Sequence, residues 1–214
     1  MDLNEHFVIT ISRQVGSGGH TVGQILADKL GVRYCDKQLA NALRAKFGLS
    51  ISAIEKMKGS KRNWLSDILQ KVAPVPSAKM LNLNPKYTQE FRAEITSDEI
   101  FRAETEILKE LAHMESCVVA GRSGFFILKD YPNRLDVFIT ASMPSRIQRV
   151  MKKQGLTEES ARILIEDIDK ARDNYIKRYT GTSRYDIRNY QLVICADGHT
   201  EEEVAQLILD YIKA

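Results

Sequence analysis

The chain has 214 residues, of which 43% are hydrophobic and 28% are charged, and its formal net charge is +3. This composition is ordinary for a soluble globular protein, and the slight, dispersed positive charge does not favour a nucleic-acid partner. No apolar run is long enough to span a membrane, and the polar start Met1–His6 does not resemble a signal peptide. We therefore expect a cytoplasmic protein with no membrane partner.

The first predicted strand, Phe7–Ile11, is apolar and rich in β-branched residues, as buried parallel strands are. A turn with three glycines in four positions follows it, and then apolar residues recur at helical spacing until Gly31. Backbone N–H groups of such a turn, together with the helix N-terminus, can bind phosphate. The order strand, turn, helix therefore predicts a phosphate-binding loop, and the alternative is a turn that binds nothing.

The loop departs from the P-loop pattern G-x-x-x-x-G-K-[ST]. Gly19-His20-Thr21 stands where Gly-Lys-Thr is expected, Gln14 then takes the first glycine position, and no lysine lies between Arg13 and Lys29. The residues expected to bind phosphate are Gly16, Ser17, Gly18, Gly19, His20 and Thr21.

A short second strand, Val32–Cys35, ends at Asp36, which either binds a ligand at the carboxyl edge of the sheet or only caps the next helix. Residues 37–114 are helical in pattern. Within them we interpret about 37–96 as a helical insertion, which would act as a substrate lid or, around Trp64, suit a homodimer contact.

Three further apolar runs predict strands at 117–120, 135–140 and 191–196, and helices separate them. Strict alternation of strands and helices predicts a parallel sheet with helices on both faces. We expect one three-layer α/β domain over 1–214, with five strands. Its core comprises 1–36 and 97–214, and a helical lid lies at about 150–184.

Arg122 follows the third strand between glycines, where its planar guanidinium suits a phosphate or carboxylate; the alternative is a surface ion pair. The predicted helix at 160–179 carries many charges, Asp169, Lys170 and Arg172 among them. They form either a solvated face or an arginine-bearing lid that closes over phosphate.

Cys35, Cys117 and Cys195 are far apart in the sequence and form no Cys-x-x-Cys pair. We expect buried, reduced thiols, and a zinc site or a reactive thiol is the alternative. The four histidines also lack the spacing of metal ligands.

With these residues in view, the chain resembles the cytidylate kinase-like family of P-loop nucleoside monophosphate kinases over nearly its whole length. The segments that carry the resemblance are Ile9–Gly19, Leu30–Lys37, Cys117–Arg122, Arg146–Met151, Asp169–Tyr175 and Tyr179–Gly181. The resemblance implies a P-loop NTPase core with a five-stranded parallel sheet, a helical NMP-binding insertion and a basic lid. It also implies transfer of the ATP γ-phosphate to CMP or dCMP with Mg²⁺.

Carried over by position, the resemblance implies that residues 16–21 cradle the donor phosphates. Asp36 would lie near the acceptor nucleotide, and Arg122 would bind the acceptor phosphate. Lys170, Arg172 and Arg178 match the lid, whose arginines stabilise charge on the transferring phosphoryl group.

Cytidylate kinases read Gly-Ser-Gly-Lys-Ser-Thr in the loop. Without a gap, Gly19 and His20 replace the lysine and the serine. With one inserted residue, His20 replaces the lysine and Thr21 keeps the hydroxyl that binds Mg²⁺. The fixed charge on the phosphates is missing in both alignments, and we expect Arg13 to supply charge from the opposite side of the loop.

Three functions remain open from the sequence. The first is a P-loop phosphotransferase that acts on a small acceptor. The second is a nucleotide-binding protein with weak or no catalysis that regulates through its insertion. The third is an α/β interaction module with a non-functional loop.

Overall fold

The structure is a computed structural model that describes residues 1–35, 97–121 and 123–214. These residues form a five-stranded sheet in the order β2-β3-β1-β4-β5, and each neighbouring pair of strands is parallel. The strands are β1 Val8–Arg13, β2 Arg33–Cys35, β3 Cys117–Ala120, β4 Arg134–Thr140 and β5 Leu192–Cys195. The predicted α/β fold with a five-stranded parallel sheet is confirmed. The predicted insertion at 37–96, Asp36 and Arg122 lie outside the described residues.

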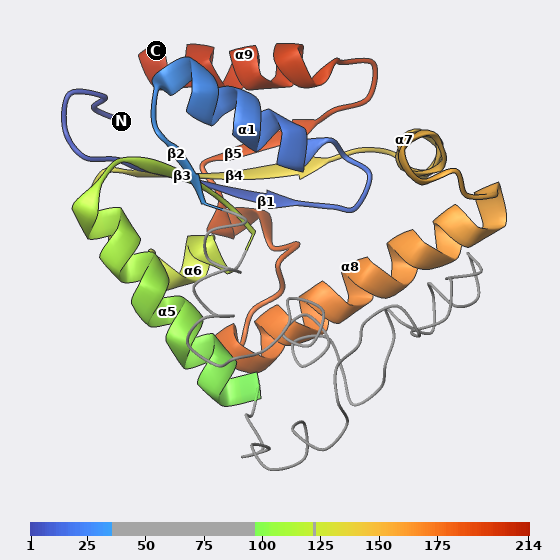
Figure 1. Ribbon diagram of the computed structural model, residues 1–214, viewed down its shortest axis with the longest axis horizontal. Coiled ribbons are helices and arrows are strands. Elements are labelled where there is room, and N and C mark those ends of the chain that lie inside the picture. The colour runs from blue at the N-terminus through green and yellow to red at the C-terminus, as the bar shows by residue number, and fades with distance from the viewer. Residues whose placement is uncertain (36–96, 122) are drawn as a thin grey trace, which may run out of the picture.

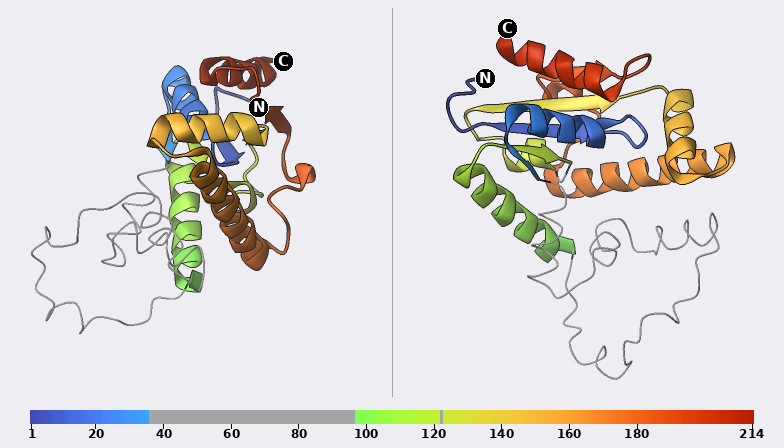
Figure 2. Two further views of the ribbon diagram at one scale, coloured as in Figure 1. Left: turned by 90° about the vertical axis from the view of Figure 1, so that its right-hand side faces the viewer. Right: turned by 45° about the horizontal axis from the view of Figure 1, so that its top comes forward.

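Helices lie on both faces of the sheet, which gives three layers (Figures 1 and 2). Helices α1 (Gly19–Leu30) and α9 (Glu201–Lys213) cover one face. The other face carries α5 (Ser97–Met114), α6 (Gly124–Ile127) and α8 (Glu158–Thr180). Helix α7 (Met143–Gln154) lies beyond the carboxyl end of β4, at the right of Figure 1. The turn from β1 to α1 lies at the same end.

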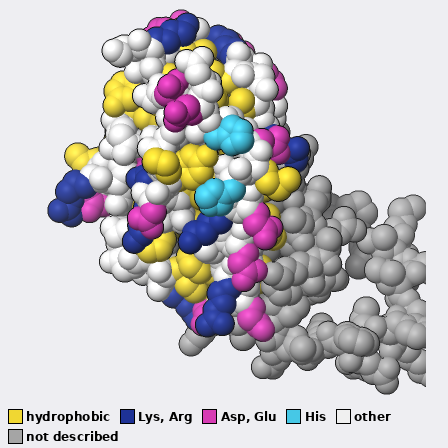
Figure 3. Space-filling model, turned by 90° about the vertical axis from the view of Figure 1, so that its left-hand side faces the viewer, with side chains coloured by type: hydrophobic (Ala, Val, Ile, Leu, Met, Phe, Trp, Pro, Cys, Tyr) yellow, Lys and Arg dark blue, Asp and Glu magenta, His cyan; other side chains and the backbone are white. Residues whose placement is uncertain are grey.

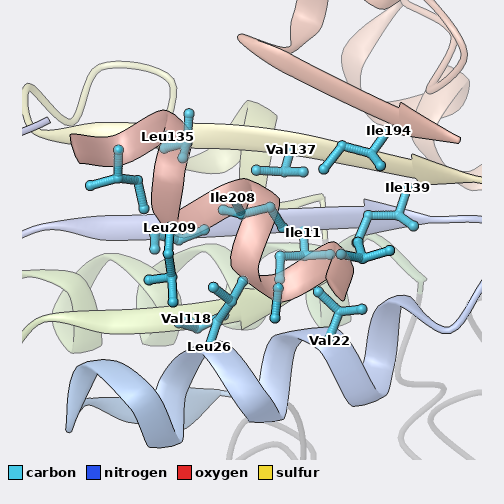
Figure 4. Packing of buried hydrophobic residues seen from close by; sticks show 14 of the residues in the cluster. Ile11, Val22, Leu26, Val118, Leu135, Val137, Ile139, Ile194, Ile208 and Leu209 are labelled. Atoms are coloured by element: carbon cyan, nitrogen blue, oxygen red, sulfur yellow. The ribbon is translucent and has the colours of Figure 1, made fainter. Parts of the chain in front are cut away.

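A hydrophobic core between the sheet and the layer of α1 and α9 holds α1 in place. Ile11 of β1 and Val137 of β4 pack with Leu26 of α1 and Ile208 of α9 (Figure 4), and these side chains are fully buried. A second cluster on the opposite face joins Val8 and other strand residues to α5. Because β1 is covered on both faces, all of its residues except Arg13 are buried, including the polar Thr10 and Ser12.

The helix boundaries follow local capping signals that the sequence shows. Thr157 and Thr200 cap α8 and α9, because each side chain accepts a hydrogen bond from the third backbone N–H of its helix. Glycines in the left-handed region end α7 and α8, at Gly155 and Gly181.

The prediction of three buried thiols is wrong for one of them. Cys35 and Cys117 are buried, but Cys195 is exposed. Its neighbour Ile194 faces the core, so Cys195 points to the opposite face of β5. Since β5 is one of the two edge strands of the sheet, that face has less cover than the face of a central strand.

Figure 3 shows the side of the molecule at which the chain begins, opposite the β1–α1 turn. Basic, acidic and hydrophobic side chains alternate among its described residues, without a continuous basic area. No helix within the described ranges is both long and apolar enough to cross a membrane.

Candidate functional site

A cavity of about 290 Å³ lies where the central strand ends. Residues 13–16 and 18–20 form one wall, and side chains of α7 and α8 form the others. The carboxyl edge of a parallel α/β sheet is the usual place for a ligand, and β1 is the central strand here.

The loop backbone requires glycine at two positions that line this cavity. Gly16 has φ +80° and Gly18 has φ +84°, which place both in the left-handed region. Ser17 between them is buried, and its N–H and hydroxyl both donate to the carbonyl of Gln14, at 3.3 and 2.9 Å. Helix α1 begins at Gly19, so its first N–H groups, which have no intrahelical partner, stand at the cavity. Such an arrangement suits an anion.

A buried ion pair braces the start of the loop. Arg146 of α7 pairs with Asp169 of α8, and the two side chains are 5% and 9% exposed. Arg146 Nε donates to the carbonyl of Val15 at 2.7 Å, and the Val15 N–H donates to Asp169 Oδ1 at 3.1 Å. The interpretation of the charges on this helix as a solvated face is therefore wrong for Asp169, because α8 packs this side against α7 and the loop.

Asp173, one turn further along α8, is also largely buried and holds the segment after the helix. It accepts hydrogen bonds from the Ser183 hydroxyl at 2.9 Å and the Arg184 N–H at 3.2 Å. Burial would raise the pKa of Asp173, but the hydrogen bonds from Lys177, Ser183 and Arg184 outweigh it and hold the pKa below its usual value. The Arg184 guanidinium in turn donates to the carbonyl of Arg13. The last residue of β1 is thus tied to the segment that follows α8.

Two basic side chains of α7 that we did not predict as site residues line the cavity, Arg149 and Lys153. Arg149 Nη2 donates to the carbonyls of Ala196 and His199, at 3.3 and 3.1 Å. Its Nη1 is buried and has no hydrogen-bond partner among the described residues. Arg149 and Lys153 are four residues apart, which puts both side chains on one face of a helix. This spacing is the signal by which the sequence could have indicated them as site residues.

Of the predicted site residues, the structure brings six to the cavity: Arg13, Gly16, Gly18, Gly19, His20 and Arg172. Ser17 is buried within the loop and does not line the cavity. Thr21 lies beside the cavity, where its hydroxyl accepts a hydrogen bond from Lys153 Nζ at 3.3 Å. Lys170 is exposed and is not part of the cavity wall.

Arg178 lies near the other end of α8 and pairs with Asp98 of α5 at 3.0 Å. Both side chains are more than half exposed. The lid roles of Lys170 and Arg178 stay predictions. So do the acceptor roles of Asp36 and Arg122, which fall outside the described ranges.

The residues that line the cavity fit a nucleoside triphosphate. The glycine turn offers backbone donors to phosphates, and the buried Arg149 Nη1 offers a donor without a partner among the described residues. Within the described part of the chain no three acidic, histidine or cysteine side chains form a metal site. Mg²⁺ usually binds together with substrate phosphates and takes few protein ligands. Thr21 is the candidate protein ligand.

Comparisons with known proteins give consistent matches along the chain. A model of the cytidylate kinase-like family matches residues 8–197. A cytidylate kinase from Sulfurisphaera tokodaii is 26% identical over 210 residues, which cover 96% of this chain and 94% of that protein.

Solved structures show the same fold. An uncharacterised protein from Eubacterium ventriosum has a TM-score of 0.68 at 22% identity, with 97% of this chain and 99% of that one covered. A shikimate kinase from Bacteroides thetaiotaomicron has a TM-score of 0.52 at 15% identity, with 97% and 99% covered. At these identities the likeness concerns the fold alone.

Proposed function

The chain belongs to the cytidylate kinase-like family, and from that premise we propose that it transfers the γ-phosphoryl group of ATP to a nucleoside monophosphate such as CMP or dCMP. The observation that carries the proposal is the cavity at the end of β1. There a glycine turn and a helix N-terminus meet basic side chains from β1, α7 and α8. Positioning and charge stabilisation supply most of the catalysis of phosphoryl transfer, and these are what such a site provides.

In this proposal Gly16, Gly18 and Gly19 bind the donor phosphates through their backbone. Arg149 and Lys153 bind donor oxygens from the side of α7, and Arg172 does so from α8. Mg²⁺ supplies charge neutralisation when it is bound with ATP. Thr21 is then available as its ligand once Lys153 turns from the threonine hydroxyl toward phosphate.

The acceptor would bind beside the donor phosphates, at the ends of β2 and β3. These strands pair in parallel, with Cys35 opposite Val119, so both strands end at the same edge of the sheet. In the sequence, Asp36 directly follows β2, and Arg122 follows the end of β3 after one glycine. We propose that Asp36 contacts the acceptor nucleotide and that Arg122 binds its phosphate.

The first experiment is titration calorimetry with ATP–Mg²⁺, alone and with CMP, dCMP and other monophosphates, followed by a coupled turnover assay. We expect micromolar ATP binding, tightened by one monophosphate, and Mg²⁺-dependent turnover with that acceptor alone. Chelation of Mg²⁺ should abolish turnover. Binding of ATP without transfer to any monophosphate would contradict the proposal and favour a nucleotide-binding regulator.

Replacing Arg172 by glutamine is expected to weaken ATP–Mg²⁺ binding by about tenfold to a hundredfold. The variant removes one charged hydrogen-bond donor from the cavity, and such a contact contributes about 1.5–3 kcal/mol. The matched control is Arg162→Gln on the same helix, where the side chain is 48% exposed and faces Glu158. Calorimetry that finds the same affinity for both variants would remove Arg172 from the site.

A further inference from the structure

The presence of glycine at position 19 has no conformational reason. Gly19 is the first residue of α1, and its φ is not in the left-handed region that requires glycine. The reason is spatial, because a Cβ at this position would lie 2.6 Å from Cβ and 3.0 Å from Cγ of Arg13. Gly19 therefore makes room for the stem of the Arg13 side chain.

The guanidinium group of Arg13 packs against a second glycine, Gly121. Gly121, which follows β3, has φ +73°, and a Cβ there would lie 1.9 Å from Arg13 Nη1 and 3.1 Å from Cζ. The Gly121 N–H donates to the carbonyl of Ile11 at 2.8 Å, which ties this turn to β1. Arg13 thus extends from the start of α1, along the cavity wall, to the carboxyl end of β3.

The basic residue at position 13 and the glycine at position 19 are exchanged relative to a standard P-loop. Gly18 is the N-cap of α1. With Gly18 as the second glycine of the pattern G-x-x-x-x-G-K-[ST], the first glycine falls at Arg13, the lysine at Gly19 and the hydroxyl residue at His20. Thr21 then lies one residue beyond the pattern, and its candidacy as a Mg²⁺ ligand rests on its place beside the cavity. The standard loop carries glycine at the end of the strand and a cation at the start of the helix. Here the cation is on the strand and the glycine is on the helix, in direct contact.

We propose that Arg13 replaces the P-loop lysine and that its guanidinium binds the transferring phosphoryl group from the side of β3. The proposal rests on the proposed kinase function. In the transfer, an acceptor oxygen bonds to the γ-phosphorus while the bond to the β,γ-bridging oxygen breaks, and ADP leaves with that electron pair. A monophosphate acceptor, dianionic near neutral pH, brings no proton to remove. Arg13 forms no covalent bond and stabilises the charge on the equatorial oxygens.

The test measures tripolyphosphate binding by calorimetry, since this probe needs no acceptor and no turnover. Arg13→Gln is expected to weaken binding by about tenfold to a hundredfold, and the control Arg162→Gln, with the same change of charge, to leave it unchanged. Where the wild type transfers phosphate, Arg13→Gln should also lower kcat by about 10²–10³-fold. Circular dichroism and the unfolding midpoint establish that each variant is folded.

An exchange of the two residues gives the sharper test. Gly19→Lys alone is expected to disrupt the loop, because its Cβ collides with Arg13. The double variant Arg13→Gly with Gly19→Lys restores the standard arrangement and should recover most of the affinity that Arg13→Gly loses.

Equal tripolyphosphate affinity in the wild type and Arg13→Gln would overturn the assignment, and so would a wild type that does not bind this probe. A wild type that binds tripolyphosphate but transfers no phosphate would refute the kinase function instead. In that case the loss of binding in Arg13→Gln still identifies the cation.

Discussion

Replacing Arg146 by methionine is expected to lower the free energy of unfolding by about 3–5 kcal/mol, because it leaves the buried Asp169 carboxylate without its partner. The Val15 carbonyl would also lose the hydrogen bond from Arg146 Nε. Since Val15 leads into Gly16, the loss should loosen the glycine turn. We therefore expect weaker tripolyphosphate binding as well as lower stability, measured by urea unfolding and by calorimetry.

The exposed pair between Arg178 and Asp98 supplies a matched control. Arg178→Met breaks an Arg–Asp contact that involves the same helix, but both of its side chains are more than half exposed. Exposed pairs contribute about 0–1 kcal/mol, so little stability should be lost. The double variant Arg146→Met with Asp169→Leu should be more stable than Arg146→Met, since no charge stays buried. Equal losses for Arg146→Met and Arg178→Met would refute a bracing role for the buried pair.

Gly16→Ala is expected to reduce tripolyphosphate binding by more than tenfold and to destabilise the fold by more than backbone strain alone, which costs about 1–3 kcal/mol. The residue has φ +80°, and a Cβ would lie 2.6 Å from the carbonyl oxygen and 3.0 Å from Cα of Arg146. Both atoms belong to the backbone, so no side-chain rotation relieves the collision. The loop or α7 must shift.

Gly31→Ala separates strain from collision. Gly31 ends α1 with φ +65°, and no atom outside Gly31 and its two chain neighbours lies within 4 Å of a Cβ built there. This variant carries the strain of an alanine in the left-handed region without a steric clash, so it should be destabilised less and bind tripolyphosphate like the wild type. Equal affinity in the two variants would show that the loop does not hold phosphate through its Gly16 turn.

The sequence determined the elements of the fold and the place of the loop. The five predicted strands all form within two residues of the expected ends. Apolar runs, caps at Thr157 and Thr200 and stop signals at glycines are local, so one sequence suffices to find them. Strict alternation then gave the parallel sheet. The glycines between β1 and α1 marked the site because their pattern is equally local.

The tertiary structure alone decided which charged residues serve the loop. Arg172 lines the cavity while Arg178, on the same helix, pairs with α5, and Asp169 is buried against Arg146. Helical spacing gives the angle between side chains of one helix, but the face that packs inward depends on the neighbouring elements. Arg13 meets Gly121 only because β1 and β3, more than 100 residues apart in sequence, are neighbours in the sheet. Contacts of this kind arise from strand order, which local propensities do not specify.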